Sequence, residues 1–255
     1  MLSSTPPRRI RALRLVPLTP VAVGTPVAVS ATYTDPGTND THTLVIDWAA
    51  NAGGLPSAGT AANGMAQGTH TYTQPGVYTV KLTLSDDDGG TYEGFYEEYI
   101  VVYDPSAGFV TGGGWIDSPP GACRFGGCTD ETTGKAHFGF VSRYHKGAKK
   151  PEGNTSFDFK AGNLSFKSTA YEWLVIAGAR AQYKGVGTIN GSGQYGFMLT
   201  AIDGALPGGR GVDRFRVKIW DLASGAIVYD NQMGAADDAE PSTALGGGSI
   251  QIHSK

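Results

Sequence analysis

The chain has 255 residues and a net charge of −3, which allows one large domain or two of ordinary size. With 40% hydrophobic and 17% charged residues, 38 glycines and 14 prolines, it favours short strands joined by tight turns and predicts the all-β class rather than helices. No apolar run is long enough to span a membrane, so we expect no membrane insertion.

Charge divides the chain into three parts. Residues 1–20 carry four arginines and no acid, and we interpret them as a linker or N-terminal extension in a piece of a longer secreted protein. Residues 21–104 carry ten acidic residues and one basic residue, a balance that argues against nucleic acid as a partner and leaves room for calcium. Residues 105–255 have a net charge of +2.

Residues 21–104 alternate between apolar and polar side chains in the manner of strands. The first predicted strand, "TPVAVSATYTD", places Val27, Val29, Ala31 and Tyr33 on one face. Further strands are predicted in "TLVIDWAA", "GVYTVKLTLSD" and "YEGFYEEYIVVYD", and the turn signals "DPGTND", "NAGGLPSAG", "TQPG" and "DDDGG" fall between them. Strands at this spacing indicate a small β-sandwich.

These residues also carry a resemblance to a known family. The stretches "VAVGTPVAVSATYTDPG", "VIDW", "HTYTQPGVYTVKLTLSDDDGGT" and "EEYIVVYD" resemble the PKD domain, which implies an immunoglobulin-like sandwich over residues 21–104. In such sandwiches a tryptophan fills the centre, so we expect Trp48 in the core. Tyr72 resembles a tyrosine corner, whose hydroxyl satisfies nearby backbone. One departure is the segment "AANAGGLPSAG" after Trp48, where the family has a Gly-Asp-Gly turn.

Residues 105–255 are predicted to form one further domain. Eight or nine alternating segments, among them "AHFGFVSRY", "TSFDFKAG", "YGFMLTAIDG" and "DRFRVKIWD", end in turn residues, and no segment has helical periodicity. The pattern indicates a second, larger antiparallel β-sandwich or jelly-roll-like domain. It resembles the β-rich module that follows PKD or Ig-like repeats in bacterial secreted or cell-surface proteins.

Two cysteines occur in the whole chain, Cys123 and Cys128, within "GACRFGGCTD". Four residues separate them, so they can close a small disulfide loop, and no His or Cys pair nearby supplies the further ligands of a zinc site. We predict a disulfide and an extracellular location.

Acidic turns are the candidate metal sites. Asp86 and Asp88 lie in "DDDGG", and Asp237 and Asp238 lie in "GAADDAEPSTALGGG", where carboxylate oxygens near flexible turns suit calcium. The spacing is not that of an EF-hand loop, and the alternative is that these aspartates cap backbone N–H groups in turns.

The sequence offers weaker evidence for catalytic residues than for metal sites. Glu172, Asp203, Asp213 and Asp221 are the carboxylates that a glycosidase could use across a sugar cleft, although aspartates at turns need no catalytic role. His137 and His145 lie about 26 Å apart on an extended strand, too far to share a metal. Nucleophile elbows and zinc-protease motifs are absent from the sequence.

Aromatic side chains are the candidate ligand-binding residues, because flat rings stack on sugar rings. We select Trp115, Tyr171, Trp173 and Tyr195, with core packing as the alternative explanation. Together, the sequence predicts a secreted or cell-surface, non-catalytic protein with a PKD-like spacer and a β module that attaches to polysaccharide or to an extracellular protein. Calcium could stiffen either domain. The alternative is that residues 105–255 are a hydrolase acting on glycans or proteins.

Overall fold

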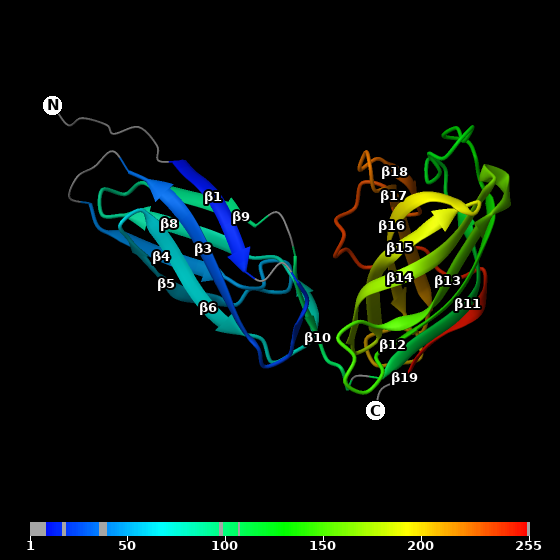
Figure 1. The fold of residues 1–255 in the computed structure, drawn as a ribbon, viewed down its shortest axis with the longest axis horizontal. Helices are drawn as coiled ribbons and strands as arrows, with labels where there is room; N and C mark the ends of the chain where they lie inside the picture. The colour runs from blue at the N-terminus through cyan, green and yellow to red at the C-terminus, as the bar shows by residue number, and fades with distance from the viewer. Residues whose placement is uncertain (1–8, 17–18, 36–39, 97–98, 107, 254–255) are drawn as a thin grey trace. The chain divides into compact units, whose positions relative to one another are not determined.

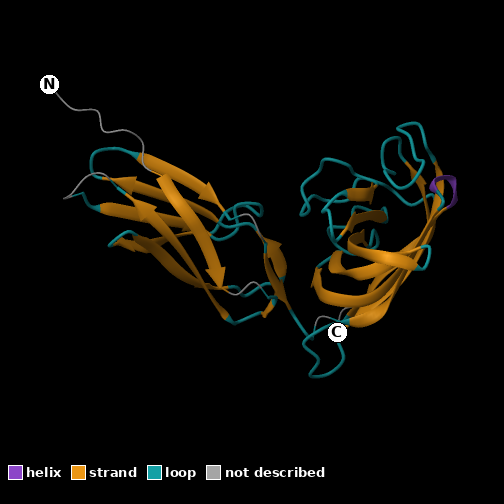
Figure 2. Cartoon of the chain, turned by 45° about the horizontal axis from the view of Figure 1, so that its top comes forward, coloured by secondary structure: helices purple, strands orange, loops and turns teal. Residues whose placement is uncertain are grey.

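The computed structural model describes residues 9–16, 19–35, 40–96, 99–106 and 108–253. The chain divides into two compact units, Met1–Val102 and Tyr103–Lys255. Strands dominate both units, and the only helix among the described residues is one 3-10 turn, Lys160–Gly162 (Figure 2). The all-β class predicted from the sequence is confirmed. No helix in the described part of the chain is long and apolar enough to cross a membrane.

The first unit contains two sheets (Figure 1). The larger has seven strands in the order β1-β3-β6-β5-β4-β8-β9, and the smaller has three in the order β2-β10-β7. The bounds are β1 Arg9–Val16, β2 Val21–Ala22, β3 Pro26–Thr34, β4 His42–Asp47, β5 Pro56–Ala62, β6 Met65–Thr71, β7 Gly76–Tyr78, β8 Lys81–Asp86, β9 Thr91–Phe95 and β10 Ile100–Tyr103.

Alternation in the sequence correctly gives the buried face of β3. Val27, Val29, Ala31 and Tyr33 are all buried, whereas the residues between them are exposed or half-buried. Two other predicted strands are each divided in the structure. The segment 76–86 becomes β7 in the small sheet and β8 in the large one, and the segment 92–104 likewise becomes β9 and β10, so the chain changes sheet twice.

Four strands of the first unit were not predicted, one of them the two-residue β2. Arg9–Val16, interpreted from the sequence as linker, forms β1 and pairs antiparallel with β3 from Arg9↔Thr34 to Val16↔Ala28. Strands β5 and β6 lie where the glycine- and alanine-rich sequence indicated a turn and loop. The first half of β5 pairs with β4 and its second half with β6, so this strand links two parts of the large sheet.

The core of the first unit surrounds Trp48, which is fully buried as expected. Tyr72 is also buried, and its hydroxyl donates a hydrogen bond of 2.8 Å to the Trp48 carbonyl oxygen. Burial raises the pKa of Tyr72 above its ordinary value, because the phenolate would be desolvated there. The hydroxyl of Tyr72 therefore satisfies backbone, the role that its resemblance to a tyrosine corner implied.

The second unit is built on one nine-stranded sheet in the order β18-β17-β16-β15-β14-β13-β12-β11-β19 (Figure 1). From β11 to β18, every strand lies beside the next strand in the sequence, and β19 returns to the free side of β11. The bounds are β11 Phe109–Ser118, β12 Gly134–Arg143, β13 Glu152–Phe159, β14 Leu164–Ala177, β15 Arg180–Ile189, β16 Ser192–Ile202, β17 Arg214–Asp221, β18 Ile227–Asp230 and β19 Gly247–His253.

One face of this sheet forms the core of the second unit. It is lined by aromatic side chains that pack on one another, including Phe138 on Phe215 with ring centroids 4.1 Å apart. The segment before β19 also reaches the start of β17, because Leu245 N–H donates to the Asp213 carbonyl oxygen at 3.1 Å. Where a sandwich or jelly roll was expected, the structure therefore has an up-and-down sheet whose two ends are drawn together around an aromatic core.

Candidate binding face

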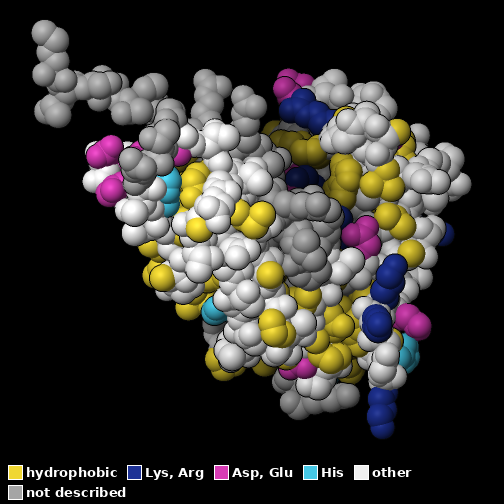
Figure 3. Space-filling view, turned by 60° about the vertical axis from the view of Figure 1, so that its left-hand side comes forward, with side chains coloured by type: hydrophobic (Ala, Val, Ile, Leu, Met, Phe, Trp, Pro, Cys, Tyr) yellow, Lys and Arg dark blue, Asp and Glu magenta, His cyan; other side chains and the backbone are white. Residues whose placement is uncertain are grey.

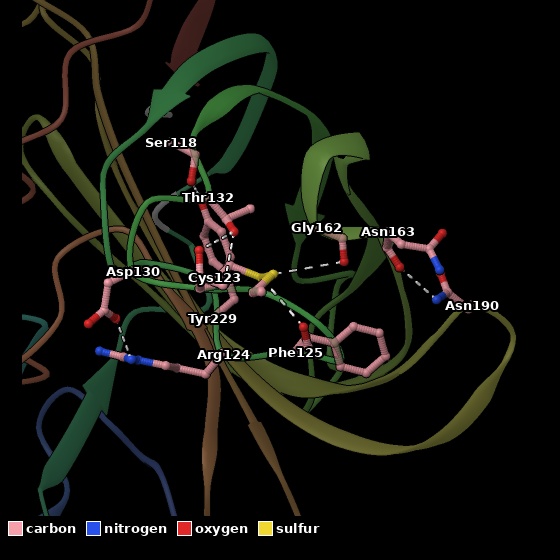
Figure 4. The surroundings of a disulfide bond; sticks show 12 residues. Ser118, Cys123, Arg124, Phe125, Asp130, Thr132, Gly162, Asn163, Asn190 and Tyr229 are labelled. Carbon is pink, nitrogen blue, oxygen red and sulfur yellow. Dashed lines mark hydrogen bonds and ion pairs between the residues drawn. A yellow bond between two sulfur atoms is a disulfide. The ribbon is translucent and has the colours of Figure 1, made fainter.

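The predicted disulfide between Cys123 and Cys128 is present, with Cα atoms 5.8 Å apart. It lies at one end of the core, where a Cβ on Gly162 would come within 2.8 Å of both sulfur atoms (Figure 4). On the same loop, Arg124 pairs with Asp130 at 2.6 Å, and the Arg124 N–H donates to the Val228 carbonyl oxygen beside β18. The disulfide therefore closes part of the loop between β11 and β12 on itself, and the Arg124 backbone hydrogen bond joins this loop to β18.

The aspartates of the first acidic turn accept backbone hydrogen bonds. The Asp86 carboxylate accepts the Gly90 N–H at 2.8 Å, and the Asp87 carboxylate accepts the Thr41 N–H at 3.1 Å. Gly89 has a φ of 85°, a conformation that favours glycine. The contacts match the turn-capping alternative, and calcium at Asp86 and Asp88 stays a prediction.

Asp237 and Asp238, the second candidate calcium pair, lie in the segment that follows β18. The carboxylate of Asp237 pairs with Lys218 at 2.6 Å, and its carbonyl oxygen accepts the Gln182 side-chain amide at 2.8 Å. Nowhere in the described ranges do three or more His, Cys, Asp or Glu side chains form a group that could hold a metal ion. Asp237 therefore fastens its segment to the outer face of the sheet.

Two other acids, Asp203 and Asp213, bind the outer edge of the last strand. Asp203 is buried and accepts the Ile252 N–H at 2.9 Å, and Asp213 accepts the Ile250 N–H at 2.7 Å. Each also accepts a backbone N–H from its own loop, Asp203 from Ala205 and Asp213 from Gly204. These carboxylates thus terminate the sheet at β19.

The remaining carboxylates considered for catalysis are in separate surroundings. Asp221 caps its turn through the Ala223 and Ser224 N–H groups, and these hydrogen bonds lower the pKa of its carboxyl group. Glu172 pairs with Lys184 at 3.1 Å on the outer face. Neither is bonded to Asp203 or Asp213, so the contacts give each acid its own structural partner.

His137 and His145, the two histidines considered from the sequence, are both exposed and lie at different places. His137 lies in the middle of the outer face of β12, whereas His145 follows the strand and lies 3.2 Å from Glu152. The two side chains therefore have different surroundings.

The four predicted aromatic residues do not form one surface. Tyr171 is buried in the core, where its hydroxyl lies 2.7 Å from Thr155 Oγ1, and burial raises its pKa. Trp173 is buried too, at 6% exposure, so neither ring is open to a ligand. Tyr195 is half-buried and packs edge-on against Phe125. Only Trp115 remains as a candidate platform.

Trp115 lies on the outer face of β11, supported by glycine backbone. A Cβ on Gly246 would collide with the benzo part of the indole, and a Cβ on Gly247 would lie 2.7 Å from Nε1. Lys135 Nζ lies over the ring, 3.7 Å from its centroid. The two glycines are therefore required for the ring to rest on this part of the chain, and the side chain that lies over the half-buried ring, Lys135, is itself exposed.

The register of the strands places Trp115 in a continuous outward row with Gly247, His137, Asp158 and Ser165. The next row along the strands is small and uncharged over most of its length, Ser249, Gly113, Gly139 and Ser156. We call the outward residues of β19, β11, β12 and β13 in these two rows the Trp115 face. This face combines one aromatic ring, polar hydrogen-bond donors and acceptors, and a row of residues with small side chains or none. Selection of aromatic residues from the sequence does not find the polar members of this row. They come from separate strands, and only the strand register shows that they are neighbours.

Comparison with protein families agrees with the fold of the first unit. Its geometry, with two sheets around a buried tryptophan and a tyrosine that bonds backbone, defines an immunoglobulin-like sandwich. The family model of the PKD domain matches residues 13–95, so the first unit contains a PKD domain, and a further β-rich unit follows it. No match was found among curated proteins or among solved structures. The PKD domain and the disulfide fit an extracellular protein.

Proposed function

We propose that this chain is a non-catalytic extracellular binding protein of the bacterial type. The PKD domain serves as a rigid spacer, and the second unit attaches to polysaccharide through the Trp115 face. The observation that carries the proposal is the geometry of Trp115, whose half-buried ring lies against Gly246 and Gly247 and has Lys135 Nζ 3.7 Å from its centroid.

The surroundings of Trp115 suit a sugar chain. The C–H faces of a sugar ring can pack on the indole, and its hydroxyl groups can bond the polar side chains His137, Asp158 and Ser156 in the neighbouring strands. The small residues Gly113 and Gly139 leave room beside the ring for further sugar units. Since the outward groups lie on strands, they are held by the sheet before any ligand arrives.

The roles of the acids support a binding module over a hydrolase. A glycosidase needs two carboxyl groups facing one cleft, about 5–9.5 Å apart. Asp203 and Asp213 are occupied by backbone N–H groups of β19, and Asp221 and Glu172 are occupied by a turn and by Lys184. We therefore assign attachment, with no bond cleavage, to this unit.

A glycan array probed with the full chain tests the proposal, with Trp115→Ala as the variant and Trp220→Ala as its control. Trp220 matches Trp115 in kind, because it also lies against a glycine, Gly196, with Lys184 5.9 Å from its ring centroid, but it sits on β17. We expect W115A to lose binding to the glycans that the native chain retains, W220A to keep it, and no shortened glycan to appear. Equal binding by native chain and W115A, or release of reducing ends, would overturn the proposal.

A further inference from the structure

We infer that the polysaccharide taken by the second unit is anionic, and that the loop between β12 and β13 recognises its negative charges. We define the basic loop as residues 143–150, "RYHKGAKK". The inference rests on the proposed function, since it names the class of polysaccharide for the same unit.

The basic loop holds four permanent cations and no acid. Arg143, Lys146, Lys149 and Lys150 are all exposed, and within the described part of the chain none of them forms an ion pair. Several other cations of the second unit are paired with acids, for example Arg124, Lys184, Arg210 and Lys218. On the face shown in Figure 3, Lys and Arg side chains lie in a few places, several of them beside Asp or Glu side chains.

The loop is anchored at both ends, so its cations are presented at a defined place. At one end, Tyr144 is half-buried: its hydroxyl accepts the Leu174 N–H at 3.1 Å, and its ring stacks on Tyr103 with centroids 4.9 Å apart. At the other end, Pro151 is buried. Between them, the Ala148 N–H donates to the His145 carbonyl oxygen at 2.9 Å, which closes a tight turn.

The turn itself is of a kind that exposes a lysine. Gly147 has a φ of 80°, as required at the third position of a type II turn, and Lys146 precedes it at the corner. Lys149 and Lys150 follow directly after the turn. Four like charges so close together repel one another, a cost that a bound polyanion would remove.

The basic loop also continues the Trp115 face. Outward positions of β12 alternate from Lys135 and His137 through Gly139 and Val141 to Arg143. Lys135 and Arg143 are therefore about 26 Å apart along one strand, at the rise of an extended chain. A polysaccharide lying along β12 would meet the indole ring near one end and the cations at the other. Anionic groups, carboxylate or sulfate, are the substituents that arginine and lysine recognise on a chain otherwise made of hydroxyl groups.

The test compares the full native chain with two variants of equal net charge. In the loop variant Lys146, Lys149 and Lys150 are changed to Gln, and in the control Arg124, Lys160 and Arg210 are changed to Gln. Probes are polygalacturonate, dextran sulfate and uncharged dextran, with affinity measured by biolayer interferometry at several salt concentrations. We expect the loop variant to lose about tenfold in affinity for an anionic probe at low salt and to show a weaker salt dependence, and the control to match the native chain. Binding of only one anionic probe would identify carboxylate or sulfate as the group recognised.

Three outcomes would overturn the inference: equal losses in both variants, which would show a net-charge effect; native binding of dextran as tight as of the anionic probes; or no binding of either anionic probe. In the last case, self-association of the native chain at low salt that is absent in the loop variant would identify the acidic first unit of a second copy as the occupant.

W115A separates this inference from the proposed function. If W115A binds as the native chain does while the loop variant fails, the proposed ring contact falls and the charge recognition stands. The reverse result would keep the ring contact and remove the charge recognition.

Discussion

Replacement of Arg216 by Met is expected to destabilise the second unit strongly. The guanidinium is buried, donates to both carboxylate oxygens of Asp230 at 3.0 and 2.9 Å, and donates to the carbonyl oxygens of Ala235 and Ala236 at 3.0 and 2.6 Å. Without it the Asp230 carboxylate, whose side chain is 1% exposed, keeps only the Gln232 N–H at 2.9 Å. Loss of one partner from a buried pair costs about 3–5 kcal/mol, because the other charge stays desolvated.

For a unit of about 150 residues, such a loss lowers the melting temperature by roughly 10 °C or more. Calorimetry of the full chain measures it, with the transition of the first unit as an internal reference. Arg124→Met is the control, because the Arg124–Asp130 pair is exposed and contributes about 0–1 kcal/mol. The double variant R216M/D230L should recover part of the loss, since no unpaired charge remains buried. If R216M melted within about 2 °C of the native chain, the Arg216–Asp230 pair would not be the fastening that the geometry indicates.

Three further outcomes are expected. Changing Cys123 and Cys128 to Ser should lower the stability of the second unit by about 2 kcal/mol, the value for so short a loop, and leave the first unit unchanged in denaturant unfolding. The free energy of unfolding should fall as pH rises above about 10. Burial raises the pKa of Tyr72, Tyr144 and Tyr229 in the folded state, so the unfolded chain releases their protons first. A free energy of unfolding that stays constant from pH 9 to 11 would contradict this. Saturating EDTA should leave the melting temperatures unchanged if the acidic turns only cap backbone, and a clear drop would instead establish the predicted calcium.

Alternation in the sequence predicted most of the long strands, but it missed β5 and β6, which are rich in small residues, and β1, which was interpreted as linker. Strand β5 has the sequence "PSAGTAA", in which glycine and alanine carry little β-propensity and no visible period. A signal was nevertheless present between β5 and β6: Asn63 and Gly64 both have positive φ, 53° and 76°, the conformation of a tight hairpin that Asn-Gly favours. Its recognition would have predicted the hairpin.

The candidate site was harder to predict than the fold, because β-bulges change which side chains share a face. Simple alternation puts Tyr171 and Trp173 on the same side of β14. The register of β14 with β15 shifts between these two residues, so Tyr171 joins the aromatic core while Trp173 lies outside that cluster. Trp115 is selected from the sequence by its residue type alone. Its neighbours His137 and Asp158 come from other strands, and only the pairing of β11, β12 and β13 identifies them.

The acids of the second unit explain why its faces, rather than its edges, are suited to attachment. An edge strand exposes backbone N–H groups to which another strand can pair. At β19 the N–H groups of Ile250 and Ile252 are taken by the carboxylates of Asp213 and Asp203, and at β18 the Asp230 N–H bonds the Ala122 carbonyl oxygen. Both ends of the sheet thus have local partners for these groups, which disfavours strand addition there. This agrees with the proposed function, in which the ligand contacts side chains that project from the Trp115 face and the basic loop.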